Sequence, residues 1–247
     1  MAATPYAPSV VINNLAAFFA HIGVEIVARE RAGAAAPAAP DPDTIIGEMA
    51  MNHYVRIDGR RRQAADGADT PHARGRRDGV VALVLGPGKY SQNGPELRKL
   101  LAGVESERMA QEGRLDEVFI FAPDKSFFAK KNLTDVLQEF ITLASRDADR
   151  EGRAPFFSAY PYSLLVMVIP DHKSVPKHRI MTDDEVKKLL AEQRKTLDDL
   201  PVIPATDPPV VWCGGRVGQV VEISRASETA GELTPYYRRI VRAKLFL

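Results

Sequence analysis

Apolar runs of strand length and apolar stripes of helical spacing alternate along residues 80–145. The continuous β-branched run at 80–85 predicts a buried strand, and a second apolar run predicts another strand at 118–121. Apolar residues three and four positions apart predict two amphipathic helices, one beginning near Pro95 and one capped by Asn132. The order strand, helix, strand, helix is typical of an α/β domain.

The chain before residue 80 contains one helical stretch and two stretches without an apolar period. Apolar residues at helical spacing over 8–30 predict an amphipathic helix that packs on a core or, as the sharper alternative, binds a partner. Alanine, proline and glycine dominate 31–44, which we interpret as a mobile linker. Arginine, aspartate and glycine dominate 58–79, which has too little apolar surface to offset chain entropy and is expected to be disordered. Between them, 45–57 is compatible with a strand or a helix.

A second domain is predicted after the polar stretch 146–154. Its clearest element is a helix that begins at Thr182 and runs to about Thr196, because the Thr182 hydroxyl and the Glu185 carboxylate can form a capping box. Asp207 before a proline predicts a single further helical turn. Apolar and β-branched runs predict extended segments at 156–159, 164–169, 200–203, 219–224 and 236–241.

These patterns predict a mixed fold with two domains. We expect an N-terminal α/β domain over residues 1–150, in which 31–44 and 58–79 are mobile insertions. We expect a small C-terminal α+β domain over residues 155–247, in which one main helix lies on a short sheet.

Composition narrows the class of protein. The chain has 247 residues, 45% of them hydrophobic and 26% charged, which is ordinary for a globular protein of one large or two small domains. Its 33 basic and 32 acidic residues nearly cancel, so any contact with nucleic acid must be local. The single cysteine, Cys213, excludes an intramolecular disulfide. We expect no membrane span and no secretion, because no apolar run is long enough and the N-terminus lacks the basic region of a signal peptide.

The residue patterns of common active sites are incomplete in this chain. Residues 86–89 read Gly-Pro-Gly-Lys between a strand and a helix, but a phosphate loop also needs glycine where Leu83 stands and serine or threonine where Tyr90 stands. A nuclease site built from Asp124 and residues 171–173 would have to span the predicted domain boundary. The five histidines lack zinc-ligand spacing, and no serine occupies a Gly-x-Ser-x-Gly elbow. The chain therefore does not resemble an enzyme, and no cofactor or metal is expected.

Two basic features remain. Six arginines lie between residues 60 and 77, and Lys125, Lys130 and Lys131 immediately precede the second predicted helix. A solvated surface is the ordinary interpretation of both features. The functional alternative is contact with the phosphates of a duplex, which requires only positive charge facing the DNA.

The last third of the chain carries a specific series of motifs. Residues 175–178 (Val-Pro-Lys-His) lead into the capped helix. Asp-Pro at 207–208, Gly-Arg-Val-Gly-Gln-Val-Val-Glu-Ile at 215–223 and Arg-Ala-Ser-Glu-Thr-Ala-Gly at 225–231 follow in this order. The series resembles the fifth subunit of eukaryotic RNA polymerases, whose C-terminal domain corresponds to a small subunit of the archaeal enzyme. Ala226 departs from the family pattern, where many relatives have proline or lysine.

Shorter motifs are similar to the version of this subunit encoded by large nucleocytoplasmic DNA viruses, in particular those related to asfarviruses. They are Gly-Lys-Tyr at 88–90, Lys-Lys-Asn at 130–132, Tyr-Pro-Tyr at 160–162 and Asp-Pro-Pro-Val-Val-Trp at 207–212. With them the resemblance extends weakly over residues 80–162.

The resemblance implies a non-catalytic subunit of a DNA-dependent RNA polymerase. Its N-terminal domain would be a jaw near downstream duplex DNA, nuclease-like in fold but without the active site. Its C-terminal domain would dock on the largest subunit and help to assemble the enzyme with the other subunits. The residues expected to contact these partners are Pro176, His178, Arg216, Arg225, Ser227, Glu228 and Thr229. The residues expected near DNA are Lys125, Lys130 and Lys131.

Other roles stay open at this stage. Each expected contact residue has an alternative role in a turn or cap within its own domain, which is favoured for Pro176, whereas an interface is favoured for 225–229. The alternative functions are a free DNA-binding transcription factor and a metal-dependent nuclease. A cellular subunit would act in the nucleus, and a viral one in the nucleus, a cytoplasmic factory or the virion.

Overall fold

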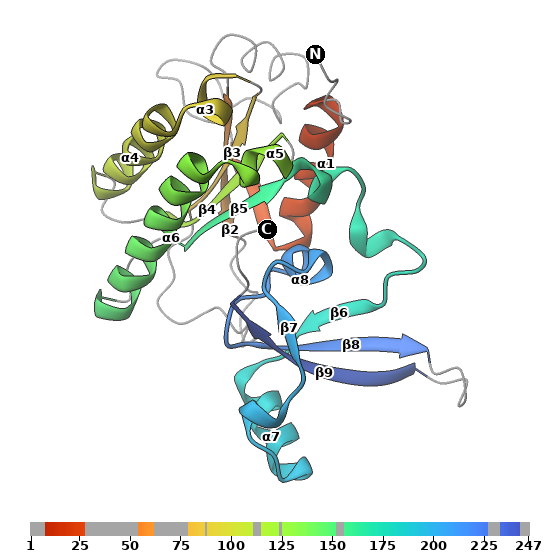
Figure 1. Ribbon diagram of the computed structural model, residues 1–247. Coiled ribbons are helices and arrows are strands. Elements are labelled where there is room, and N and C mark those ends of the chain that lie inside the picture. The colour runs from red at the N-terminus through yellow and green to blue at the C-terminus, as the bar shows by residue number, and fades with distance from the viewer. Residues whose placement is uncertain are drawn as a thin grey trace. The chain divides into compact units, whose positions relative to one another are not determined.

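The described chain folds into two compact units, each with its own sheet (Figure 1). This computed structural model describes residues 8–27, 54–61, 79–86, 88–110, 115–123, 125–151, 156–226 and 233–242. The first unit ends at Val166 and the second begins at Met167. The predicted mixed fold of helices and strands is confirmed.

The first unit is built on a five-stranded sheet in the order β1-β2-β3-β4-β5. β1, β2 and β3 pair antiparallel, whereas β3, β4 and β5 pair parallel. Its elements are α1 (Pro8–His21), β1 (Val24–Val27), β2 (Tyr54–Arg61), β3 (Gly79–Leu85), α3 (Lys89–Gln92), α4 (Gly94–Ala110), β4 (Leu115–Ala122), α5 (Lys125–Ala129), α6 (Lys131–Glu151), β5 (Phe156–Pro161) and η1 (Tyr162–Leu165).

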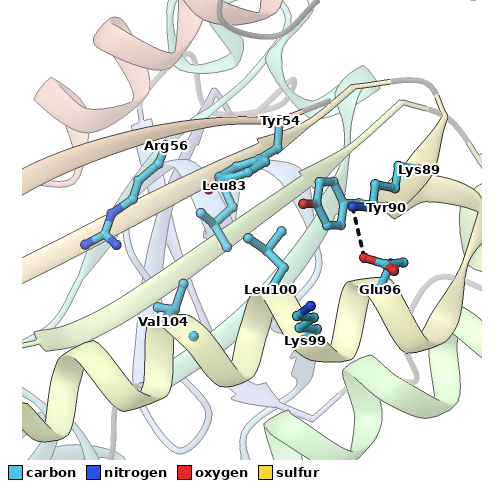
Figure 2. Close-up of a pocket in the computed structure, with 10 residues that line it drawn as sticks. Tyr54, Arg56, Leu83, Lys89, Tyr90, Glu96, Lys99, Leu100 and Val104 are labelled. Carbon is cyan, nitrogen blue, oxygen red and sulfur yellow. Dashed lines mark ion pairs between the residues drawn. The ribbon is translucent and has the colours of Figure 1, made fainter. Parts of the chain in front are cut away.

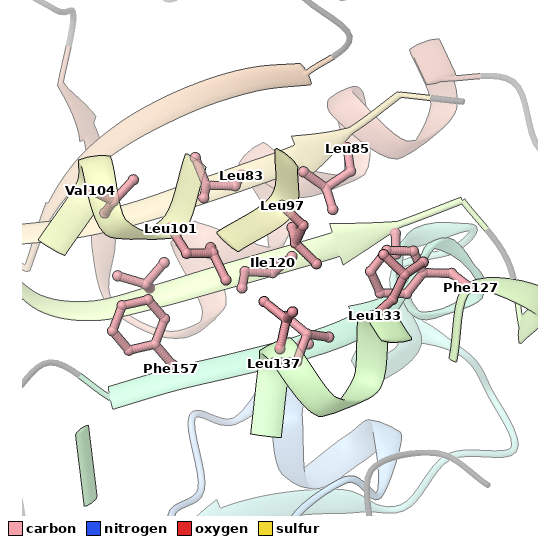
Figure 3. Packing of buried hydrophobic residues seen from close by; sticks show 14 of the residues in the cluster. Leu83, Leu85, Leu97, Leu101, Val104, Ile120, Phe127, Leu133, Leu137 and Phe157 are labelled. Atoms are coloured by element: carbon pink, nitrogen blue, oxygen red, sulfur yellow. The ribbon is translucent and has the colours of Figure 1, made fainter. Parts of the chain in front are cut away.

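Helices cover both faces of this sheet, which explains why β3 is an uninterrupted apolar run. α4 and α6 lie on one face, where their leucines meet Leu83 and Ile120 (Figure 3). α1 lies on the opposite face (Figure 1), where the ring of Phe18 meets that of Phe119 edge to face at 5.3 Å. Alternate residues of β3 and β4 therefore fill two separate apolar layers.

The N-terminal expectations need two corrections. The helix predicted over 8–30 ends at His21, because Gly23 adopts a positive φ of 72° and the chain continues as β1. Residues 58–61, expected to be disordered, form the second half of β2, where pairing with β1 on one side and β3 on the other overrides the polar composition. The linker at 31–44 and the rest of the insertion, 62–78, lie outside the described residues.

Two further elements differ from their prediction. Residues 164–169, predicted as a strand, contain the end of η1 and the beginning of η2 (Ile169–Asp171) instead. The apolar side chains of Leu164 and Leu165 are buried in this 3-10 turn, so their apolar character does not indicate a strand. The Asn14 side chain on α1 donates a hydrogen bond to the Leu165 carbonyl at 2.8 Å. Asn132 lies inside the first turn of α6, and Lys130 precedes the helix with a carbonyl that accepts from Thr134 at 3.1 Å.

The division between the units falls later than the predicted boundary. β5 pairs with β4, and the Tyr162 hydroxyl donates to the Leu85 carbonyl at the end of β3 at 2.6 Å. Residues 156–166 therefore belong to the first unit, although the second domain was predicted to begin at 155.

The second unit is built on a four-stranded sheet in the order β6-β8-β9-β7. Besides η2, its elements are β6 (Lys177–Ile180), α7 (Asp183–Gln193), η3 (Leu197–Asp199), β7 (Val202–Pro204), α8 (Pro208–Trp212), β8 (Val220–Ala226) and β9 (Leu233–Val241). α7 packs on one face of the sheet around Leu189, and α8 packs on the other around Val210 (Figure 1).

The capping box predicted for the main helix is confirmed. The Thr182 hydroxyl accepts from the Glu185 amide at 3.2 Å, and the Glu185 carboxylate accepts from the Thr182 amide at 2.8 Å. The helix ends at Gln193, three residues before the predicted end, because Arg194 turns into the left-handed region with a φ of 51°. None of the helices described here is long and apolar enough to cross a membrane.

Candidate functional site

Three strands of the second unit bring a mixed group of side chains onto one face of the sheet. The register places His178 on β6 opposite Ile223 on β8, and Ile223 opposite Tyr236 on β9. The next pair on the same face is Arg225 and Thr234. Residues directly opposite in adjacent antiparallel strands project to the same side, so these five side chains form one surface. We call it the hairpin face.

The hairpin face continues an apolar layer that α8 covers. Toward the other end of the same strands, Val221 and Ile240 pack with Val210 of α8, and this cluster reaches as far as Ile223, which is 9% exposed. Tyr236 next to it keeps 48% of its surface exposed. An exposed aromatic ring at the rim of an apolar layer is typical of a surface that contacts another protein.

His178 is oriented by the backbone that leads into β6. Its Nδ1 lies 2.7 Å from the Pro176 carbonyl oxygen, so Nδ1 carries the proton in the tautomer that this bond requires. Both residues are half-buried. The Pro176 carbonyl thus fixes one edge of the His178 ring.

Asp207 lies at the N-terminus of α8, as the sequence predicts. Its carbonyl accepts from the Val211 amide at 3.0 Å. Burial raises the pKa of its carboxyl.

The remaining expected contact residues of the second unit fall into three groups. Arg225 is exposed on the hairpin face. Arg216 is half-buried in the turn between α8 and β8, where its amide donates to the Gln219 side chain at 2.8 Å. Ser227, Glu228 and Thr229 lie outside the described residues. The structure thus brings His178 and Arg225 together but not Arg216.

The opposite face of the sheet carries an ion-pair network. Arg179 on β6 donates to Glu185 of α7 at 2.8 Å and pairs with Glu222 of β8. Arg179 thereby attaches α7 to the sheet, and the bonds to Glu185 lower the pKa of that carboxyl to about 2. This network joins β6, β8 and α7 on the face of the sheet opposite the hairpin face.

The lysines expected near DNA lie where α5 and α6 follow β4. Lys125 begins α5 and Lys131, which is exposed, begins α6. Lys130 is half-buried, and its ammonium group donates to the Ser91 carbonyl at 3.3 Å, which joins the start of α6 to α3. Of the two lysines whose side chains are described, Lys131 is the one directed to solvent.

The residues considered for catalysis do not converge in the described parts of the chain. Within the described residues, no three His, Cys, Asp or Glu side chains lie close enough to hold a metal ion, and Asp124 is outside them. Lys89, the lysine of the Gly-Pro-Gly-Lys segment, pairs with Glu96 at 3.1 Å. Burial raises the pKa of the Cys213 thiol to about 11, so it is a poor nucleophile.

Comparisons with known proteins identify relatives of this chain. The family model of the RNA polymerase Rpb5 C-terminal domain matches residues 167–241, which is nearly all of the described second unit. The DNA-directed RNA polymerase RPB5 homolog of African swine fever virus (isolate Tick/Malawi/Lil 20-1/1983) is 35% identical over 154 residues, 62% of this chain and 69% of the viral protein. The DNA-directed RNA polymerase subunit Rpo5 of Thermococcus celer is 47% identical over 70 residues, 28% of this chain and 83% of the archaeal protein.

These matches define the class of protein first: a non-catalytic subunit of a multisubunit DNA-directed RNA polymerase. Within that class, the chain belongs to the Rpb5 family. The resemblance drawn from the sequence motifs, including the resemblance to an asfarvirus relative, is confirmed.

Sequence reasoning missed the two apolar members of the hairpin face. Ile223 and Tyr236 were predicted to lie in strands, but their place on a common face was not recognised. The signal was present, because alternate residues of a strand share a face and the neighbouring strand pairs in register. The register itself became visible only in the structure.

Proposed function

We propose that this subunit docks on the largest polymerase subunit through the hairpin face and that its first unit forms part of a jaw around downstream DNA. The observation that carries the docking proposal is the row His178, Ile223 and Tyr236, which continues an apolar layer out to a half-exposed ring. Arg225 adds a planar cationic group beside the ring, suited to a carboxylate or carbonyl of the partner.

The chemistry of this surface fits a protein partner better than a nucleic acid. Tyr236 supplies exposed aromatic area, and Arg225 and Arg238 are the two arginines that the register places on this face of β8 and β9. Aromatic residues and arginine are the types that contribute most at protein interfaces. Contact with DNA backbone would instead require several cations at phosphate spacing.

Substitution on the hairpin face tests the docking proposal. Tyr236→Ala combined with Arg225→Glu should reduce the amount of largest subunit that co-purifies with the intact chain by at least about tenfold, as expected for interface hot spots. The matched control is Lys187→Ala with Lys188→Glu on α7, on the opposite face, where both side chains are more than two-thirds exposed. The control should co-purify as the unsubstituted chain does.

Thermal unfolding of the same variants separates docking from folding. If the hairpin-face variant loses the partner but unfolds at an unchanged temperature, the residues act at an interface. If it retains the partner in full, the proposed docking surface is wrong. If its unfolding temperature collapses, the side chains stabilise the unit itself.

The jaw proposal is supported by the basic residues that follow β4. Lys131 is exposed at the start of α6, and Lys125 precedes it by six positions at the start of α5. Reconstituted polymerase with Lys131→Glu should hold a downstream duplex less tightly, and the slope of log affinity against log salt should fall by about 1 for each phosphate that is no longer neutralised. An unchanged slope would argue that Lys131 faces away from the DNA.

A further inference from the structure

A pocket of about 270 Å³ opens on the first unit (Figure 2). β2 contributes one wall, and α3 and α4 contribute the other. On α4 the lining residues fall at positions 96, 99, 100, 103 and 104, which is the spacing of one helical face. One face of α4 therefore lines the pocket over about two helical turns.

The inner surface of the pocket is apolar. Leu83 of β3 and Val104 of α4 are buried at its base, and Leu100 lies half-buried beside them. The rings of Tyr54 and Tyr90 meet edge to face at 5.3 Å and close one end (Figure 2). This surface is suited to an aliphatic or aromatic side chain.

The charged groups at the rim differ in whether they have a partner. Lys89 pairs with Glu96 at 3.1 Å, an ion pair that raises the pKa of Lys89, and Arg56 pairs with Asp58 at 2.9 Å. Lys99 is exposed and makes no ion pair with any residue that the structure describes. Among the described residues at the rim, Lys99 is therefore the cation that is available to pair with a ligand, and it lies next to the apolar base of the pocket.

A glycine keeps this pocket open. Gly103 lies in the interior of α4, where glycine is less favourable than alanine. A Cβ added at Gly103 would meet no described atom within 4 Å, so neither close packing nor a positive φ requires glycine here. A larger residue at this position would stand in the opening of the pocket.

We propose that this pocket binds an acidic peptide segment of another protein, with one apolar side chain in the pocket and a neighbouring carboxylate on Lys99. The volume is below the roughly 300–1,000 Å³ of sites that hold whole small molecules and fits a single side chain. A polyanion such as DNA fits less well, because Glu96 lies at the rim beside the cations. A single carboxylate, by contrast, needs only the one free ammonium group of Lys99.

The experiment uses the intact chain and a fluorescein-labelled nine-residue peptide with a central leucine flanked by aspartates. Two matched peptides carry alanine for the leucine or asparagine for the aspartates, and a single-stranded DNA oligonucleotide of similar length represents the other class of ligand. Anisotropy measures affinity. The amide resonance of Gly103 in glycine-labelled protein reports whether the ligand reaches the pocket. This resonance is identified as the one that is lost in the Gly103→Ala variant.

We expect the acidic leucine peptide to shift the Gly103 resonance, and each matched peptide to bind at least about tenfold more weakly. Gly103→Leu should block binding and Lys99→Ala should weaken it at least about tenfold, whereas Ala102→Leu, at the adjacent exposed position, should leave it unchanged. All three substituted positions are exposed on the helix, so the variants should fold.

Four results would overturn the proposal. They are an unmoved Gly103 resonance at millimolar peptide, equal binding by Gly103→Leu, equal binding of the asparagine peptide, or preferential binding of the oligonucleotide at Gly103. None of these results bears on docking through the hairpin face, which lies in the other unit.

Discussion

Arg179 on the edge strand β6 donates to both carboxylate oxygens of Glu185 on α7, at 2.8 and 2.9 Å. Glu185 is also the residue that closes the capping box with Thr182. One carboxylate therefore completes the start of the main helix and attaches that helix to the sheet. The sequence shows the capping box, because its residues are three positions apart, but the partner on the strand depends on how the helix packs.

The stability of the second unit should fall in acid because of Glu185. Hydrogen bonds from Arg179 and from the Thr182 amide lower the pKa of its carboxyl from 4.5 to about 2. The unfolded chain thus takes up the proton at higher pH than the folded chain does. The stabilisation is complete above about pH 5 and is lost as the pH falls toward about 2.

Denaturant unfolding at a series of pH values measures this effect. Glu185→Gln should be less stable than the unsubstituted chain at neutral pH, and the difference should shrink as the pH falls. Asp184→Asn is the matched control, since among the residues that the structure describes Asp184 pairs with exposed Lys187 on the same helix. A difference that stays constant down to about pH 2 would contradict the assigned cause.

Tyr162→Phe should destabilise the first unit by about 1–3 kcal/mol, because it leaves the buried Leu85 carbonyl without the hydroxyl that donates to it at 2.6 Å. The same bond ties η1 to the end of β3. Tyr90→Phe is the control, because the Tyr90 hydroxyl forms no hydrogen bond with the residues described. Equal stability of the two variants in chemical denaturation would show that the Tyr162 bond contributes little.

Gly215→Ala should destabilise the second unit by about 1–3 kcal/mol through overpacking. A Cβ at this position would lie 2.7 Å from side-chain atoms of both Ile240 and Val210, inside the apolar cluster under α8. Gly103→Ala provides the contrast, since it meets open space within a helix and should raise stability by about 0.5–1 kcal/mol. We expect the unfolding temperature to fall in Gly215→Ala and to rise in Gly103→Ala. An unchanged unfolding temperature in Gly215→Ala would show that the side chains around Gly215 rearrange without loss of stability.

Local signals in the sequence identified several elements of the two units. The β-branched run of β3, the apolar stripes of α4 and α6 and the Thr182 capping box all appear in the structure as predicted. The errors arose where tertiary pairing outweighed local composition. Residues 58–61 are polar, yet they form a strand between two other strands. Residues 164–169 are apolar like a strand, yet this segment contacts helix α1 instead of joining a sheet.

The candidate site was predictable only in part. His178 and Arg225 were recognised from family motifs, whereas Tyr236 was not, because strand register decides which residues share a face. Lys130 stays a residue expected near DNA, and the structure adds a hydrogen bond from its ammonium group to the Ser91 carbonyl, 39 positions away. Spacing along the chain carries no information about such a contact.

The most direct test of the central claim is to purify the intact, tagged chain under mild conditions and identify the co-purifying chains by mass spectrometry. We predict the largest polymerase subunit in amounts comparable to the tagged chain, together with other polymerase subunits. We also predict that the hairpin-face variant loses them. A chain that purifies without any polymerase subunit, or whose hairpin-face variant retains them all, would contradict this claim.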